Sequence, residues 1–465
     1  MVTVLKFSMP ADRSLQHLFS SLIVFSALWL CSNAIAGGLI LDGVRLVDIA
    51  NGSVSEPQRL VVSDDRIVAA SQASAARRPF RVIDAQGLFV MPGLSEMHAH
   101  VPNTQNMQFV EDVLTLFLAH GITTVRGMLG EPGHLRLRQE LARGLIDGPR
   151  LITSGPSLNG QSVTSPEQAE QLVRTQHEAG YDFLKLHPGL WDETFDAITT
   201  TADDLGMTYA GHVSVAVGLE KALASRQTTI DHLDGYAQLL VPPGSEAANQ
   251  PPGFFGMAIA DALDPQRIEP MATRTAMAEV WNVPTQSLIE NLAVNSIEDL
   301  NDRPAMRWVS PDVQQQWQQQ IETLRATQSR ETLVRFVELR RDLIKALHDA
   351  GAGLLLGADA PQIMNVPGDS THHELELLVA AGLSPREALA TGTLAVSRFL
   401  EDPEHGCLNA GCKADLVLLE DNPLDDIEHT RLIAGVVRDG QWFDRAELDA
   451  RLADIEQRNN PEAPD

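Results

Sequence analysis

The strongest constraint on the fold is a series of eight short apolar segments that alternate with longer helical patterns in the middle of the chain. The segments are VMPGLSEMHAH, GITTVRGM, PRLITSGPSL, YDFLKLH, MTYAGHV, TTIDHLDG, EVWNVPTQSL and AGLLLGADA. Strands that alternate with helices are typical of a parallel sheet, and eight such units are the number that closes a (β/α)8 barrel. The sequence therefore predicts an α/β fold built on a (β/α)8 TIM barrel over residues 91–397.

Short strand-like runs with turn residues between them also occur on both sides of this central part. They are GLILDGVRLVDIANGSV, RLVVSDDRIVAA and FRVIDAQGLFVMPG before it, and ADLVLLEDNPL and LIAGVVRDGQWF after it. Apolar alternation bounded by turn residues is typical of β-strands. We expect two β segments, residues 37–90 and 398–450, followed by a tail over residues 451–465 whose last ten residues, EQRNNPEAPD, are disordered.

Residues 1–36 have the pattern of a secretory signal peptide. Two basic residues precede the apolar run LFSSLIVFSALWLC, and Ala34 and Ala36 form an A-x-A cleavage site. The alternative is a membrane anchor, but the run is short for a span and is followed by small residues. We therefore expect cleavage, a mature protein that is periplasmic or secreted, and no stable membrane anchor.

The remaining cysteines, Cys407 and Cys412, lie close together in the segment CLNAGC. In an oxidising compartment such a pair forms a disulfide, and the alternative is two small buried thiols. The sequence leaves both alternatives open. The formal net charge of -27 disfavours nucleic acid as a partner.

Polar side chains interrupt the apolar segments near their C-terminal ends. They are His98, His100, Lys185, His212, His232 and Asp359. Side chains alternate along a strand, so His98 and His100 share one face, and the C-terminal ends of barrel strands meet at one mouth. Imidazoles and carboxylates suit zinc and similar divalent ions, whereas a buried lysine is costly unless it is neutralised or paired. The pattern predicts a metal site at the barrel mouth.

These segments resemble the amidohydrolase superfamily, specifically its imidazolonepropionase-like and Xaa-Pro-dipeptidase-like branch. The resemblance rests on PGLSEMHAH, GITTVRG, GPRLITSGPSL, FLKLH, AGHV, TIDHLDG, LLGADAP, HHELELLVAAGLSPREALATGT and GCKADLVLLEDNPL, and covers nearly everything after residue 36. It implies that the flanking strands form the small β-sandwich that such enzymes build from both chain ends.

The resemblance also implies a ligand set, with His98, His100 and Asp359 for one divalent metal ion, His212 and His232 for a second, and zinc as the expected metal. Lys185 would be carbamylated by carbon dioxide and would bridge both ions. Burial agrees with this role, because a desolvated lysine has a lowered pKa and is a free amine for part of the time. Asp359 would also act as the general base. One-metal members exist, so the number of ions stays open.

Two positions depart from the family pattern. Glu96 stands where D-x-H-x-H is common, and Gly127 follows Arg126 where T-T-V-R-D is common. Neither is an implied ligand, but both can alter the groups that orient the ligands.

Four further residues are weaker candidates for substrate binding: His187, Asn159, Tyr236 and His372. Packing is the alternative for each. The Pro/Gly-rich loop LVPPGSEAANQPPGFFG and an insert over residues 291–330 disturb the regular repeat, and we expect both to project from the C-terminal face of the barrel.

Together these features predict a metal-dependent hydrolase in which a metal-bound hydroxide attacks the amide carbonyl of a dipeptide or N-acyl amino acid. The alternatives are an esterase or lactonase at the same binuclear site, and a non-catalytic metal-binding homologue. A deaminase fits less well, because such members usually lack the bridging lysine. The expected partner is a small amide or peptide substrate, and assembly into a homo-oligomer stays open.

Overall fold

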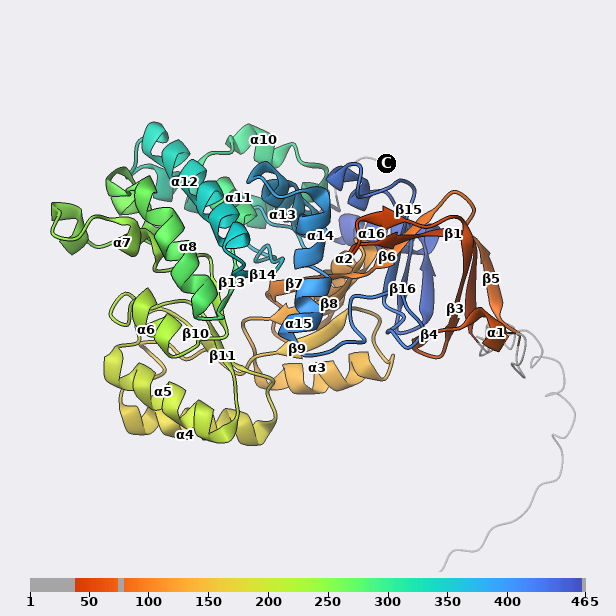
Figure 1. Cartoon of the computed structure of the whole chain (residues 1–465), viewed down its shortest axis with the longest axis horizontal. Coiled ribbons are helices and arrows are strands. Elements are labelled where there is room, and N and C mark those ends of the chain that lie inside the picture. Colours follow the sequence, from red (N-terminus) through yellow and green to blue (C-terminus); the bar gives the residue numbers. More distant parts are fainter. Residues whose placement is uncertain (1–37, 74–78, 462–465) are drawn as a thin grey trace, which may run out of the picture.

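The computed structural model describes residues 38–73 and 79–461, and the predicted signal peptide lies outside them. Strands that run parallel to one another follow in chain order through the middle of the described chain (Figure 1). β7 (Leu94–Ala99), β8 (Ile122–Gly127) and β9 (Arg150–Thr153) form one sheet, and β10 (Leu184–Leu186), β11 (Tyr209–Gly211), β12 (Thr229–Asp231), β13 (Trp281–Val283) and β14 (Gly353–Leu354) form another. The α/β prediction is therefore confirmed.

Isolated parallel bridges join the two sheets at both of their edges. Ser154, which follows β9, pairs with Phe183, which precedes β10. On the other side Ala99 of β7 pairs with Ala360, beyond β14. All eight predicted segments thus contribute neighbouring parallel strands, so their C-terminal ends lie on one side of the arrangement.

Helices surround these sheets (Figure 1). They include α2 (Met107–Ala119), α3 (Pro132–Ala142), α4 (Pro166–Ala179), α5 (Asp192–Leu205), α6 (Leu219–Ala224), α8 (Ile268–Met277), α9 (Gln286–Ala293), α12 (Arg330–Asp349), α13 (Asp369–Ala380), α14 (Pro385–Thr391) and α15 (Leu394–Phe399). In α12, Leu333, Phe336, Leu343 and Leu347 are buried, at the spacing of one helical face. No helix within the described residues is long and apolar enough to cross a bilayer.

The N-terminal and C-terminal strands of the described chain share one nine-stranded sheet, in which they meet where β15 pairs with β6 (Figure 1). Its strands are β1 (Leu39–Asp48), β2 (Ser53–Val54), β3 (Gln58–Ser63), β4 (Arg66–Val68), β5 (Arg81–Asp84), β6 (Phe89–Pro92), β15 (Leu416–Leu419), β16 (Ile433–Arg438) and β17 (Gln441–Asp444). β6 and β15 are antiparallel neighbours, with Val90 opposite Leu418. Both side chains are buried in an apolar cluster that also contains Leu41 and Val62.

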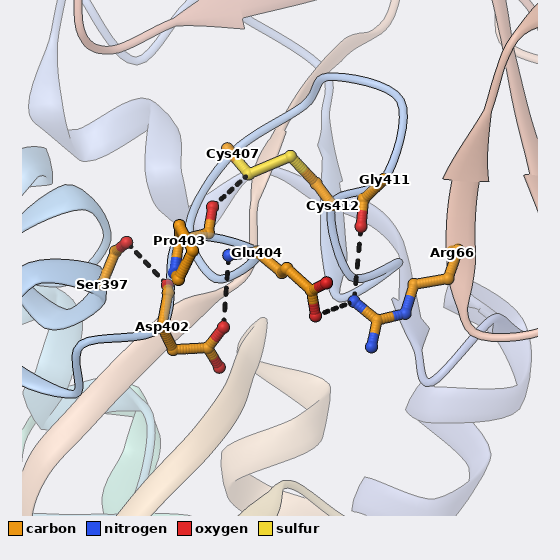
Figure 2. The surroundings of a disulfide bond; sticks show 8 residues. All are labelled: Arg66, Ser397, Asp402, Pro403, Glu404, Cys407, Gly411 and Cys412. Atoms are coloured by element: carbon orange, nitrogen blue, oxygen red, sulfur yellow. Dashed lines mark hydrogen bonds and ion pairs between the residues drawn. A yellow bond between two sulfur atoms is a disulfide. The ribbon is translucent and has the colours of Figure 1, made fainter.

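Cys407 and Cys412 form a disulfide in the loop that precedes β15, which resolves the two alternatives left by the sequence (Figure 2). The loop is anchored on β4. The Ile67 N–H donates to the carbonyl oxygen of Cys412 over 2.9 Å, and the Arg66 guanidinium donates to that of Gly411 over 3.3 Å. The disulfide thus closes a short loop that fastens the C-terminal strands to the N-terminal ones.

The predicted tail differs from the structure, because α16 spans Arg445–Asn459. Leu448, Leu452 and Ile455 are buried at the spacing of one helical face. The helix packs against α2 and β16. Residues 451–459 are therefore part of the fold, and the polar composition of the segment concealed this apolar face.

The insert over residues 291–330 does not lie over the mouth as a whole. It contains α10 (Ile297–Asn301), the 3-10 helix η4 (Pro304–Trp308) and α11 (Pro311–Arg325). The Trp308 ring lies 5.2 Å from the ring of His120, the C-cap of α2, and Asn459 donates to the Trp308 carbonyl oxygen. Since α2 ends where β8 begins, η4 lies toward the N-terminal ends of the parallel strands, where it fills the space between α2 and α16.

Candidate metal centre

Three of the predicted ligands meet at the C-terminal ends of β7 and β14. His98 lies on β7, His100 just beyond it, and Asp359 five residues after β14. The Asp359 Oδ1 atom is 3.1 Å from His100 Nε2 and 3.4 Å from His98 Nε2. One donor atom from each residue lies within 4.8 Å of the others, a spacing that suits a single cation. His98 and Asp359 are buried, whereas His100 is half-buried and open to the mouth.

His212 and His232 extend this group across the mouth. The His232 ring lies 4.5 Å from the ring of His98 and 4.5 Å from that of His212. Each of the two is oriented by a neighbour: His212 Nδ1 is 2.7 Å from an Asp234 carboxylate oxygen, and His232 Nδ1 is 2.8 Å from the Thr285 hydroxyl. Such partners set the ring orientation and tautomer of a metal-binding histidine.

Lys185 lies on β10 and has no exposed surface. Its Nζ atom is 3.4 Å from Asp231 Oδ2, yet burial lowers the pKa of the ammonium group below its ordinary value. Gly211 at the end of β11 leaves room for this side chain, because a Cβ atom there would lie 2.9 Å from Lys185 Cδ. Burial thus favours the free amine of Lys185 over its ammonium form more than water does.

Asp231 is the residue that the sequence analysis missed. It has no exposed surface, and its Oδ2 atom lies 3.1 Å from His98 Nδ1 as well as close to Lys185. From the segment IDHLDG, only His232 was predicted to face the site. The signal for Asp231 was the charge itself, since a carboxylate within the apolar run TTID must have a partner when it is buried.

Backbone geometry brings His232 and Asp359 into the site despite strand alternation. His232 has φ 60°, and Asp359 has φ 65°, both in the left-handed region that side-chain-bearing residues seldom adopt. Each amide is held by a neighbouring strand: His232 N–H donates to Val283 O over 2.8 Å, and Asp359 N–H to His98 O over 2.9 Å. Strained conformations of this kind gather at functional sites.

The chemistry of these groups fits a divalent cation. Within the described residues, His98 Nδ1, Asp231 Oδ1 and Asp359 Oδ1 are buried and make no hydrogen bond of suitable geometry, although charged or polar atoms lie 3.1 Å from the first and the last, and this is costly unless a ligand satisfies them. Burial lowers the pKa of His98 and His232 well below the ordinary value, so both rings are neutral and can donate a lone pair. Burial also raises the pKa of Asp359 to about 7.

Glu96, one of the two departures from the family pattern, holds the ligand-bearing segments together. It is fully buried and accepts hydrogen bonds from Ala358 N–H and Thr371 Oγ1, both over 2.7 Å, and from His98 N–H over 3.3 Å. It therefore connects the backbone beside His98 to the backbone beside Asp359. Burial raises the pKa of Glu96 to about 8.

The weaker substrate-binding candidates separate into two pairs. His187 and Asn159 line an open pocket of about 640 Å³, and the His187 ring lies 4.8 Å from that of His212. Tyr236 and His372 are instead buried, with their polar atoms engaged elsewhere. The Tyr236 hydroxyl donates to Asn282 over 2.8 Å, and the two His372 nitrogens bond Thr430 Oγ1 and the His120 carbonyl oxygen, each over 2.9 Å. The structure thus brings only the first pair to the mouth.

Known proteins resemble this chain in sequence and in fold. An adenine deaminase from Nitratidesulfovibrio vulgaris is 26% identical over 210 residues, 42% of this chain and 35% of that protein. The chain spans 14% to 35% of the length of the adenine deaminases it matches. The structure of a bottromycin amidohydrolase has a TM-score of 0.69 and 23% identity, and covers 90% of each chain. A protein of Bifidobacterium longum provisionally assigned as a prolidase has a TM-score of 0.62 and 25% identity, over 90% of this chain and 99% of its own.

The family model that matches this chain covers its entire parallel-strand region. The match runs over residues 89–443 and is described as the amidohydrolase family. It includes every predicted ligand and most of the C-terminal strands of the outer sheet. The chain therefore belongs to the amidohydrolase family.

Proposed function

We propose that this hydrolase of C–N bonds cleaves the amide bond of a dipeptide or N-acyl amino acid at a zinc centre. The observation that carries the proposal is the convergence of His98, His100 and Asp359 with a buried Lys185 at one end of the parallel strands. We also infer that the eight strands form a closed barrel and that the outer sheet is a β-sandwich, supported by the bridges at both sheet edges and by the separate apolar cluster of the outer sheet.

The chain's own side chains divide into holding and reacting groups. His98, His100 and Asp359 would hold one ion, His212 and His232 a second, with Lys185 as a carbamate between them. When bound, divalent ions in such a site activate water and polarise a carbonyl oxygen.

Asp359 acts as the general base in this proposal. Its carboxylate would accept a proton from the attacking water and return it to the leaving nitrogen. His187 stands beside His212 and lines an open pocket with Asn159, so the polar end of a substrate would lie in this pocket.

The Lys185→Ala variant tests the centre. We expect loss of most activity and of at least one ion per chain, measured by turnover of N-acyl amino acids and by metal analysis, with partial recovery when a short carboxylic acid is added. Lys345→Ala is the matched control, because that lysine pairs with Asp349 on the outer surface of α12. A variant that keeps two ions and the full rate would contradict the carbamate.

The substrate panel should include aryl esters, lactones and adenine beside the amides. Chelation should abolish turnover and zinc should restore it. If esters or lactones react faster than any amide, the esterase alternative replaces the peptidase proposal.

We further propose that the protein is exported after cleavage of its first 36 residues. The Cys407–Cys412 disulfide supports this, since such bonds persist in oxidising compartments. Finding the original N-terminus on the mature protein by N-terminal sequencing would contradict it.

A further inference from the structure

An aromatic pair lies against the histidines at the mouth. The loop after β12 and α7 (Tyr236–Leu240) leads into the 3-10 helix η2 (Phe254–Ala262). The Phe255 ring lies 5.1 Å from the ring of His232, and it stacks at 6.4 Å and 11° on the ring of His212. Phe254 packs edge-on against Phe255, with ring centroids 4.2 Å apart. Phe255 is half-buried, whereas Phe254 is 46% exposed.

The backbone of this loop is held in a conformation that is unfavourable for a bulky residue. Phe255 has φ 51° and ψ 18°, in the left-handed region. Gly256 follows with φ 91°, and a Cβ atom there would lie 2.3 Å from the Cβ atom of Ala237 on α7. The loop therefore approaches α7 as closely as a glycine allows, and this contact holds the Phe255 ring over the site. Strain of this kind is a reason to look for a function.

A polar neighbour also lies beside His212. The His187 ring is 4.8 Å from the His212 ring. His187 and Asn159 line an open pocket. A molecule bound over His212 thus meets both the His187 imidazole and the aromatic ring of Phe255.

Exposed apolar side chains also follow two other strand ends. Leu129, after β8, lines the same pocket as His187 and Asn159, and Val215 follows the C-terminal end of β11. Exposed apolar residues are common singly, but here they occur at strand ends that surround the metal centre.

We propose that Phe255, supported by Phe254, is a specificity-determining residue that selects substrates with an apolar or aromatic group next to the scissile amide. The polar end of the same substrate lies toward His187 and Asn159. This inference rests on the proposed amide hydrolysis and adds the substrate class. An aromatic group that packs against the Phe255 ring removes more apolar surface from water than a small substituent does, and therefore binds more favourably.

The test uses the metal-loaded full chain and two pairs of substrates. N-acetylphenylalanine against N-acetylglycine varies the amine side, and phenylacetylglycine against acetylglycine varies the acyl side. We expect wild type to prefer the aromatic member of at least one pair in kcat/KM. Phe255→Ala should lower that preference about tenfold, the range for losing apolar contacts in a pocket. Phe255→Gly, which also relieves the positive φ, should give the same loss, and Phe255→Leu a smaller one.

Phe109→Ala is the matched control, since Phe109 is 47% exposed, on α2. The Phe109→Ala variant should have the same ratio of kcat/KM values for the aromatic and the small substrate as wild type. If Phe255 only supported His232, its variants would lower both members of a pair equally and leave the ratio unchanged. An unchanged ratio in both pairs, or a wild type without aromatic preference, overturns the proposal.

Calorimetry separates this inference from the proposed function, because it needs no turnover. Metal-loaded wild type should bind phenylacetate more tightly than acetate. In Phe255→Ala, the ratio of the acetate Kd to the phenylacetate Kd should be about tenfold smaller. If wild type cleaves no amide but this loss is seen, the proposed function fails and the aromatic surface stands. If the variant binds both acids as wild type does, the aromatic surface is rejected whatever the enzyme cleaves.

Discussion

Buried carboxylates lie at both ends of the parallel strands, but only at one end are their oxygen atoms fully hydrogen-bonded. At the N-terminal end, Asp415 accepts hydrogen bonds from Asp439 N–H over 2.8 Å, from Arg150 Nη2 over 3.2 Å and from Arg438 Nη1 over 3.4 Å. At the C-terminal end, Asp231 and Asp359 each keep a buried oxygen without a hydrogen-bond partner.

The difference indicates what each end is for. Arg150 opens β9, whereas Asp415 immediately precedes β15 and Arg438 ends β16 of the outer sheet, so the Asp415 carboxylate connects the two parts of the fold. A buried ion pair that is well hydrogen-bonded is costly to break, because the remaining charge has no partner. Carboxylates left unsatisfied among neutral imidazoles are instead prepared for a ligand, and perturbed groups of this kind cluster at functional sites. Substitutions at the two ends should therefore separate catalysis from stability.

The largest effect should come from Asp359→Asn. The amide can occupy the site but cannot accept the proton, so turnover should fall by about 10² to 10⁴, the range for losing a general base. Metal content, measured on the same preparation, should change less than the rate does. Circular dichroism should show the same folded structure. Turnover close to that of wild type would remove Asp359 from the mechanism.

Asp415→Asn should give the reverse pattern. Asparagine keeps an acceptor oxygen but removes the buried charge that pairs with Arg438 and with the half-buried Arg150, and leaves both arginines only the partly exposed Asp439. We expect the free energy of unfolding in urea to fall by roughly 2–3 kcal/mol, as for a buried, charge-assisted contact. Activity per folded molecule should stay near that of wild type. Asp349→Asn on the surface of α12 is the control and should change stability much less. Equal losses in both variants would contradict the structural role of Asp415.

The strand framework was predictable because periodicity reports it directly. Each of the eight apolar segments is a parallel strand, and alternation with convergence at one end brought the six predicted ligands together. Periodicity failed where the chain departs from strand geometry. His232 turns into the left-handed region, so the preceding Asp231 also faces the site, which a simple in-and-out count misses.

The helical candidates were harder to place. Tyr236 begins α7 and His372 lies in α13. Nearness to a ligand in the sequence does not determine which way a helix presents a side chain. Partners distant in sequence decide it, such as Asn282 for Tyr236 and Thr430 for His372.

The smallest effect is a pH dependence that distinguishes the two ends in the metal-free protein. Burial raises the pKa of Asp359 from 3.8 to about 7, so between these values the folded state binds more protons at this group than the unfolded state does. Lowering the pH through that window therefore stabilises wild type through Asp359, and raising it removes the contribution. Buried histidines with lowered pKa, such as His98 and His232, change stability in the opposite direction, but wild type and the Asp359→Asn variant share them.

The quantity to measure is therefore the free energy of unfolding of Asp359→Asn minus that of wild type, obtained from urea unfolding after chelation. Since asparagine does not titrate, the variant should be the more stable protein at pH 8, and its advantage should shrink by about 1 kcal/mol at pH 6. Asp415→Asn, treated in the same way, should be less stable than wild type at both pH values. If the difference between Asp359→Asn and wild type stays constant or grows as the pH falls, the Asp359 carboxylate is stabilised by its surroundings. Asp359 and Asp415 would then not differ in this respect.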